Sequence, residues 1–130
     1  ASICLLTALL QAWLMTMVRY FDAVFVKKLF PNYRDLVRSH IDYLMMTALV
    51  FSLYLILINL EIQLPSFVLW LVFVGSLYNP FGFMLQAIKP DIVDGGGIAA
   101  KVGVVFGFLP LTIGLSWSAV EILLVSVDKL

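Results

Sequence analysis

The single histidine of this chain, His40, is the residue whose type best suits metal binding or proton transfer. It stands in the segment NYRDLVRSHIDYLMM (32–46), where a basic stretch runs into a long apolar one. Neutral imidazole is the commonest protein ligand for metals and a usual axial ligand of haem iron. Two interpretations follow for His40: a haem ligand near the membrane interface, or a residue that caps a helix start at the level of the lipid headgroups.

A haem on His40 would need both basic and apolar neighbours. The porphyrin would lie among apolar side chains such as Met45, although methionine also fills apolar gaps routinely. Its propionates would point toward water, where Arg34, Arg38 or Lys28 can pair with them. No nucleophile stands with an adjacent base in the sequence, which has no second histidine, so a hydrolytic triad is not expected.

Polar and helix-breaking residues mark a second candidate site. Counting 1.5 Å per residue from the nearest basic or histidine position puts Gln11, Thr47, Pro80 and Pro110 about 10–14 Å inside the membrane. Neither proline can donate a backbone hydrogen bond, and irregular backbone at membrane depth is tolerated where it is buried or lines a cavity. The pattern predicts either ordinary kinks with polar side chains holding helices together, or a polar pocket. The residues around that pocket would be Gln11, Thr47, Ser76, Tyr78, Asn79 and Thr112.

Composition determines the environment. Of the 130 residues, 63% are hydrophobic and only 12% are charged, whereas soluble domains carry about 25% charged residues. The net charge of zero gives no indication of nucleic-acid binding. Cys4, the only cysteine, cannot form an internal disulfide and is expected to be a small apolar filler. We therefore predict a single transmembrane domain over residues 1–130, embedded in a lipid bilayer.

Four apolar stretches predict an all-α, integral membrane four-helix antiparallel bundle. The expected helices cover about residues 2–21, 40–60, 65–88 and 98–127. The first lacks the basic segment of a signal peptide, so we read it as a membrane helix. Because the chain does not begin with methionine, its start is expected to be either processed or the beginning of a fragment, and in the second case the helix would lack its first turn. Asn79-Pro80 interrupts the third, and Gly95–Gly97 is expected to form a flexible turn before the fourth rather than a phosphate-binding loop.

The start of the second helix has two possible positions. Asn32 is followed three residues later by Asp35, and Ser39 by Asp42. In each pair an N-cap oxygen and an acidic side chain can satisfy free backbone N–H groups of a first helical turn. The membrane-embedded part is expected from Ile41 onward in either case.

Basic residues predict the orientation of the helices in the membrane. They flank the first and third connections, which lie on the same side of a four-helix bundle, while Lys129 alone lies opposite. Because basic loops stay in the cytoplasm, both termini are predicted to be non-cytoplasmic in the inner (plasma) membrane. Lys101 and Glu121 are about 30 Å apart along one helix, so both can reach an interface, and Glu121 is expected to be an anchor.

The triplet Arg38-Ser39-His40, followed by Met45-Met46 in a small four-helix membrane protein, resembles the styrene oxide isomerase family. That family has a closely similar Arg-Ala-His at the start of its second helix. The resemblance implies that His40 is the axial ligand of haem b. It also implies a homotrimer with haem at the subunit interfaces, and a ferric iron that acts as a Lewis acid on an epoxide, opening the ring to give an aldehyde.

In that family an asparagine and a tyrosine from helices two and three orient the epoxide. Six residues after His40, at the position of the asparagine, this chain has Met46, and the tyrosine position falls near Phe83. Tyr78 and Asn79 are the nearest candidates for the two catalytic roles. These departures favour a haem protein of the same architecture with different chemistry over a true isomerase.

The sequence therefore leaves two functions open. The first is a haem-binding, oligomeric membrane protein whose open iron site suits isomerisation of a small lipophilic substrate such as an epoxide, or gas or redox sensing. The alternative is a non-catalytic membrane subunit that packs within a larger membrane complex. A small transporter is less well supported, because no buried ion pair or inverted repeat is evident.

Overall fold

The structure is a computed structural model that describes residues 1–91 and 98–129. Its helices are α1 (Ser2–Tyr20), α2 (Val24–Leu29), α3 (Tyr33–Leu60), α4 (Ser66–Ile88) and α6 (Ile98–Asp128). Within the described residues, four helices are long and apolar enough to cross a membrane: Ser2–Tyr20, Tyr33–Leu60, Ser66–Ile88 and Lys101–Asp128. The predicted all-α, multi-pass membrane bundle is confirmed. The turn predicted at Gly95–Gly97 lies outside the described residues.

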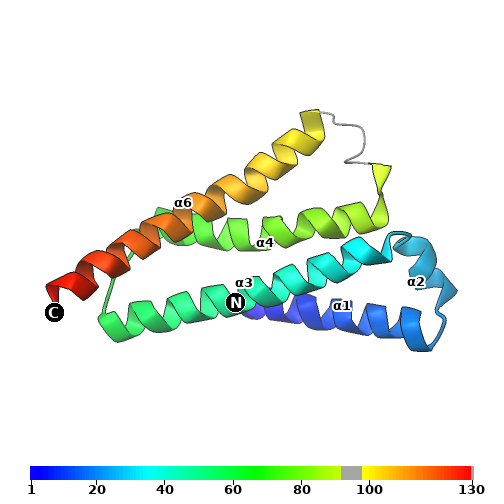
Figure 1. The fold of residues 1–130 in the computed structure, drawn as a ribbon, viewed down its shortest axis with the longest axis horizontal. Coiled ribbons are helices and arrows are strands. Elements are labelled where there is room, and N and C mark those ends of the chain that lie inside the picture. Colours follow the sequence, from blue (N-terminus) through cyan, green and yellow to red (C-terminus); the bar gives the residue numbers. More distant parts are fainter. Residues whose placement is uncertain (92–97, 130) are drawn as a thin grey trace.

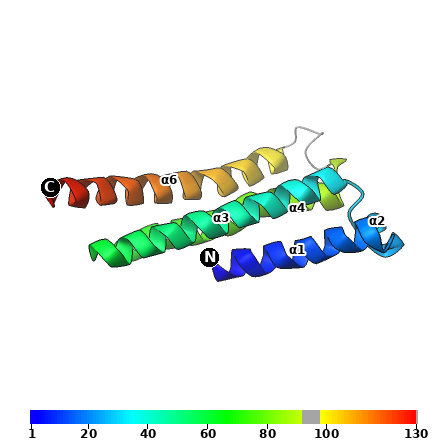
Figure 2. The same cartoon turned by 60° about the horizontal axis from the view of Figure 1, so that its bottom comes forward.

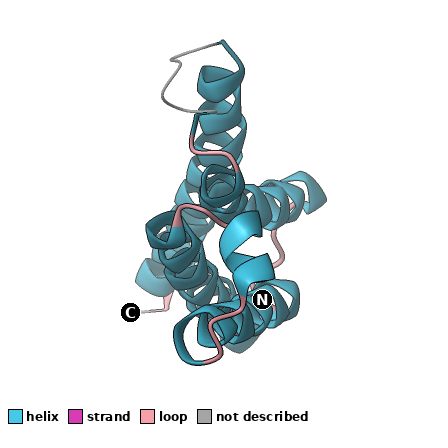
Figure 3. Ribbon diagram, turned by 90° about the vertical axis from the view of Figure 1, so that its right-hand side faces the viewer, coloured by secondary structure: helices cyan, strands magenta, loops and turns pink. Residues whose placement is uncertain are grey.

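The long helices are packed in chain order. α1 packs on α3, α3 on α4, and α4 on α6, each pair running antiparallel (Figure 1). α1 and α6 lie on opposite sides of the α3–α4 pair, and α1 begins beside the middle of α3 (Figure 2). Figure 3 looks along the helices from the end at which α2 lies. The α1–α3 connection is at this end, and so are the facing ends of α4 and α6.

The second long helix begins earlier than the predicted range of 40–60. Asn32 is its N-cap: its side-chain oxygen accepts the backbone N–H of Asp35 at 3.4 Å, and its amide donates to the Asp35 carboxylate at 2.6 Å. The Asn32 start is thus confirmed. The Ser39 start is wrong, because Ser39 lies fully buried inside α3. His40 consequently stands about two turns inside the helix and does not cap it.

Sequence analysis did not predict the short helix α2. α1 ends at Tyr20, and α2 follows before Pro31. Its buried residue Val26 packs with Phe30, Leu36 and Ala87, which joins the segment to α3 and α4. Such a short helix is stabilised by tertiary contacts rather than by the helix propensity of its residues, so a local sequence pattern does not predict it.

A surface ion pair spans the turn between α1 and α2. Lys27 donates to the carboxylate of Asp22, and both side chains are exposed. The Lys27 ammonium beside it holds the pKa of the Asp22 carboxyl below its ordinary value. Because the pair is fully hydrated, its contribution to stability is small, and it mainly marks this turn as lying outside the lipid.

Glycine allows α4 and α6 to approach closely. A Cβ atom added at Gly75 would lie 2.5 Å from the backbone nitrogen of Leu111, and one at Gly114 would lie 2.7 Å from Val72 Cγ2. Small residues at a helix contact let backbones approach in lipid, where packing replaces the hydrophobic effect as the driving force. Contrary to the predicted interruption, α4 continues as a helix through Pro80.

Substitution at these glycines tests this packing. Gly75→Ala should destabilise the bundle by about 1–3 kcal/mol, because the added methyl group meets the backbone of α6. Gly82→Ala is the matched control on the same helix, since nothing lies within 4 Å of a Cβ at that position. Thermal unfolding in detergent should separate the two variants, and equal melting temperatures would contradict the close contact.

Candidate functional site

Ser39 joins α1, α3 and α4 at one point inside the membrane-spanning region. Its side chain is fully buried. The Ser39 hydroxyl accepts a hydrogen bond from Gln11 Nε2 at 2.8 Å and donates one to the backbone carbonyl of Pro80 at 2.9 Å. The Gln11 amide also reaches Met84 Sδ at 3.6 Å. Three helices are therefore held together by one serine and one glutamine.

His40, the residue after Ser39, is half-buried against α1. Its Nδ1 lies 2.9 Å from the backbone carbonyl oxygen of Ala8. A carbonyl oxygen only accepts hydrogen bonds, so Nδ1 carries the hydrogen and the lone pair of neutral His40 is on Nε2. Histidines that bind metals hold their second ring nitrogen in this way, which fixes the tautomer and the ring orientation.

Pro80 changes the hydrogen bonding of α4 one turn before it. Because proline has no N–H, the carbonyl of Ser76 lacks its usual partner within the helix. Cys4 donates its S–H to that carbonyl across the helix contact, with Sγ 3.7 Å from the oxygen. The predicted filler role of Cys4 is thus incomplete: it is buried, as an apolar residue would be, and it is also a hydrogen-bond donor.

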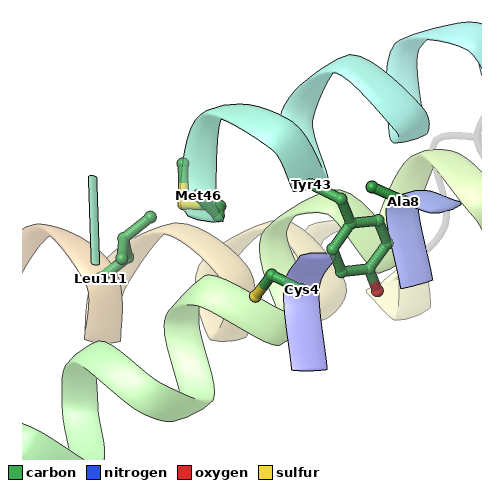
Figure 4. Packing of buried hydrophobic residues seen from close by; sticks show 5 residues of the cluster. All are labelled: Cys4, Ala8, Tyr43, Met46 and Leu111. Carbon is green, nitrogen blue, oxygen red and sulfur yellow. The ribbon is translucent and has the colours of Figure 1, made fainter. Parts of the chain in front are cut away.

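Cys4 belongs to a small core cluster with Ala8, Tyr43, Met46 and Leu111 (Figure 4). Cys4 and Ala8 come from α1, Tyr43 and Met46 from α3, and Leu111 from α6. The Tyr43 hydroxyl donates to the carbonyl of Leu77 on α4 at 3.2 Å. This cluster lies next to the Ser39 junction and adds a further hydrogen bond between α3 and α4.

Two buried oxygen atoms have no partner among the described residues. They are Gln11 Oε1 and Asn79 Oδ1. Gln11 is only 1% exposed, and its amide hydrogens are directed to Ser39 and Met84. The neighbouring donors, which are the thiol of Cys4 and the hydroxyls of Ser39 and Tyr43, each donate to a backbone carbonyl. This part of the bundle therefore has more acceptors than donors. An unsatisfied oxygen at such a position costs about 1–3 kcal/mol.

The predicted haem-binding residues do not share one face of α3. Met45, five positions after His40, lies roughly 140° around the helix from it and is 49% exposed. Arg38 is turned by a similar angle and pairs with Asp35 at 2.9 Å, while Arg34 is exposed near the helix start. Of the predicted set, only His40 lies in the α1–α3 contact.

The predicted catalytic pair stands on α4 directly before Pro80, whose carbonyl accepts a hydrogen bond from Ser39, the residue before His40. Tyr78 is 56% exposed and packs edge-on against Phe81 of the same helix. The backbone of Asn79 lies beside Gly107 of α6, whereas His40 lies against α1.

The six residues expected around a polar pocket are also divided. Gln11 and Ser76 are buried at the junction, and the Thr47 hydroxyl donates to the carbonyl of Tyr43 in its own helix. The backbone of Asn79 lies beside Gly107 of α6, and Tyr78 and Thr112 are exposed. They therefore do not converge on one pocket, and what the structure has at this level is a hydrogen-bonded junction.

Sequence reasoning missed Ser39, Tyr43 and Ala8 as parts of the site. A usable signal was present. Cys4, Ala8 and Gln11 are spaced four and three residues apart, as are Ser39, Tyr43 and Met46, and such spacing places each set on one helix face. Each set contains small or polar residues, such as Ala8 and Ser39. Sets of this kind with equal spacing on consecutive helices indicate a close helix contact in lipid.

The described residues contain no group of three or more His, Cys, Asp or Glu side chains placed to hold a metal ion. A centre built from several protein ligands is therefore absent from this part of the chain.

No protein-family model matches this chain, and comparisons with curated proteins and with solved structures return no match either.

A double-mutant cycle tests the contact between Cys4 and the Ser76 carbonyl. Cys4→Ala should destabilise the bundle, and part of that loss, about 0.5 kcal/mol, should vanish in a Pro80→Ala background. Alanine at position 80 restores the N–H that satisfies the Ser76 carbonyl, so the thiol donor is no longer needed. Unfolding of the four proteins in detergent gives the coupling energy, and strictly additive effects would refute the contact.

Proposed function

We propose that this protein binds haem b, with Nε2 of His40 as an axial ligand of the iron. The observation that carries the proposal is the contact between His40 Nδ1 and the Ala8 carbonyl at 2.9 Å. It leaves Nε2 with a free lone pair on an imidazole whose orientation is set by α1. The half-buried position of His40 among apolar helices also suits a large apolar ligand.

The chain supplies one side of such a site. His40 would hold the iron, and Arg34, exposed near the start of α3, is available to pair with a propionate. Arg38 is engaged by Asp35, and Met45 lies on another face of α3. The rest of the haem surface would be covered by a neighbouring copy, which agrees with a homo-oligomer and, by the family resemblance, with a trimer.

A bound haem with one protein ligand supplies a Lewis-acidic, redox-active iron. Isomerisation of an epoxide is the narrower form of the proposal. In this form Tyr78 and Asn79 would orient the substrate, although the backbone of Asn79 lies beside Gly107 of α6 while His40 lies against α1. Haem binding with gas or redox sensing makes no demand on these two residues.

The orientation in the membrane is a further part of the proposal. Arg19, Lys27, Lys28 and Arg34 lie at the end of the bundle that carries α2, and Lys89 follows α4 at the same end. With this end in the cytoplasm, both termini face the opposite side of the inner membrane. His40 and its Ser39 neighbour then lie in the cytoplasmic half of the bilayer.

An absorption spectrum tests the haem proposal directly. Protein purified from haem-supplemented cells should be coloured and show a Soret band, and His40→Ala should abolish it because no second histidine exists. Thr47→Val, about two turns further along α3, is the matched control and should keep the band. A colourless wild-type protein, after addition of haemin as well, would overturn the proposal.

A second candidate function is favoured by a shallow, open apolar groove along one side of α4, lined by Ser66, Leu69, Trp70 and Phe73. These residues lie nearer the start of α4 than Ser76, whose carbonyl is contacted by Cys4 of α1. A helix of another membrane protein would fit there, as expected for a non-catalytic subunit of a larger complex.

Labelling of an introduced cysteine tests this second candidate. Leu69→Cys should react more slowly with a lipid-soluble maleimide in native membranes than after purification in detergent, because a partner covers the groove only in the membrane. Val120→Cys, an exposed position on α6, is the control. Its labelling rate in native membranes, divided by its rate in detergent, should be higher than the same ratio for Leu69→Cys. If both positions behave alike, the groove has no protein partner.

A further inference from the structure

We propose that Gln11 and Ser39 are positioning residues that select the tautomer of His40, so that Nε2 is the nitrogen offered to a ligand. This inference deepens the proposed function, since Nε2 is the proposed haem ligand. It concerns the protein without haem, however, and can be tested on its own. It is argued from three hydrogen bonds: Ser39 to Pro80, Gln11 to Ser39, and His40 to Ala8.

The first contact sets the rotation of α3. Ser39 is fully buried, and its hydroxyl is fixed on the Pro80 carbonyl of α4 at 2.9 Å. Consecutive residues of a helix are turned by about 100° from one another. With Ser39 directed at α4, His40 is directed away from α4 and toward α1.

The second contact sets the position of α1 along α3. Gln11 donates from Nε2 to Ser39 Oγ at 2.8 Å, and its amide is buried with only 1% of the residue exposed. Ala8 lies three residues before Gln11, on the same face of α1 one turn away. Holding Gln11 at Ser39 therefore brings the Ala8 carbonyl to the level of His40, where it accepts from Nδ1 at 2.9 Å.

The third observation is that the junction offers His40 no competing donor. The Ser39 hydroxyl is directed to Pro80, the Tyr43 hydroxyl to Leu77, and the amide hydrogens of Gln11 to Ser39 and Met84. The unpartnered Oε1 of Gln11 is an acceptor as well. The ring therefore donates from Nδ1 and keeps its lone pair on Nε2, open to a Lewis acid or a proton.

Imidazole nitrogen NMR tests this inference, because the chain has a single histidine. Haem-free protein labelled with ¹⁵N-histidine in lipid nanodiscs, at a pH where the ring is neutral, should give signals of the Nδ1–H tautomer. Gln11→Leu and Ser39→Ala should lose these signals in favour of the Nε2–H tautomer, which free imidazole side chains prefer in water. Loss of stability alone would not exchange the two nitrogens in the folded protein.

Matched controls separate positioning from general loss of a polar residue. Ser118→Ala removes another buried serine, whose hydroxyl donates to the Gly114 carbonyl within α6 at 2.8 Å, and Gln86→Leu removes another glutamine, one that is half-buried. Both should keep the Nδ1–H signals. Circular dichroism should give the same helix content for all four variants, and if Gln11→Leu loses helix, Gln11→Met replaces it in the comparison.

Each result decides the question. A wild-type protein with the Nε2–H tautomer overturns the inference and removes the support for Nε2 as a ligand. A wild-type Nδ1–H tautomer that survives in Gln11→Leu and Ser39→Ala overturns the positioning roles. A selected Nδ1–H tautomer in a protein that never takes up haem supports the positioning roles while the haem proposal fails.

Discussion

The need to satisfy polar groups without water is the constraint on which the centre of this bundle depends. Pro80 removes one backbone donor from α4 at membrane depth, and no water is available in hydrocarbon to replace it. The carbonyl of Ser76 is instead satisfied by Cys4 of α1, and the carbonyl of Pro80 takes a bond from Ser39 of α3. The two carbonyls next to the missing hydrogen bond of α4 thus accept hydrogen bonds from two other helices.

This arrangement places buried polar side chains of α1 and α3 in hydrogen bonds with α4. Each hydrogen bond between membrane helices is worth only about 1 kcal/mol, so the junction stabilises the bundle modestly. Its larger effect is geometric, because it fixes the rotation of α3 and the height of α1. The orientation of the His40 ring follows from the rotation of α3, from the position of α1 along α3 and from the Ala8 carbonyl. A ligand of His40 would therefore meet Nε2.

The contact between α4 and α6 is of another kind. Gly75 and Gly114 let the two backbones approach until a methyl group would not fit. The bundle therefore has one half around α4 and α6 in which glycines allow close packing, and a hydrogen-bonded half around α1, α3 and α4. The histidine belongs to the second half, and the predicted catalytic residue Asn79 belongs to the first.

The sequence by itself determined the fold class, the membrane environment and the approximate helices, because hydrophobic length and the clustering of charge are local properties. It also held the correct start of α3 in the Asn32–Asp35 pair, but it offered Ser39 as an equal choice, since a capping pattern carries no information about burial. Only the tertiary structure decided that Ser39 is inside the helix and bonded to α4.

The same limit applies to the site. Sequence spacing identified His40, Gln11 and Ser76 as candidates, yet it grouped them with Tyr78 and Thr112 by depth alone. Depth follows from counting residues along a helix, whereas the direction of a side chain relative to its neighbours follows from how the helices are rotated against each other. That rotation is set by contacts between residues far apart in the chain, such as Gln11 with Ser39 and Cys4 with Ser76, so only the folded arrangement could decide which polar groups meet.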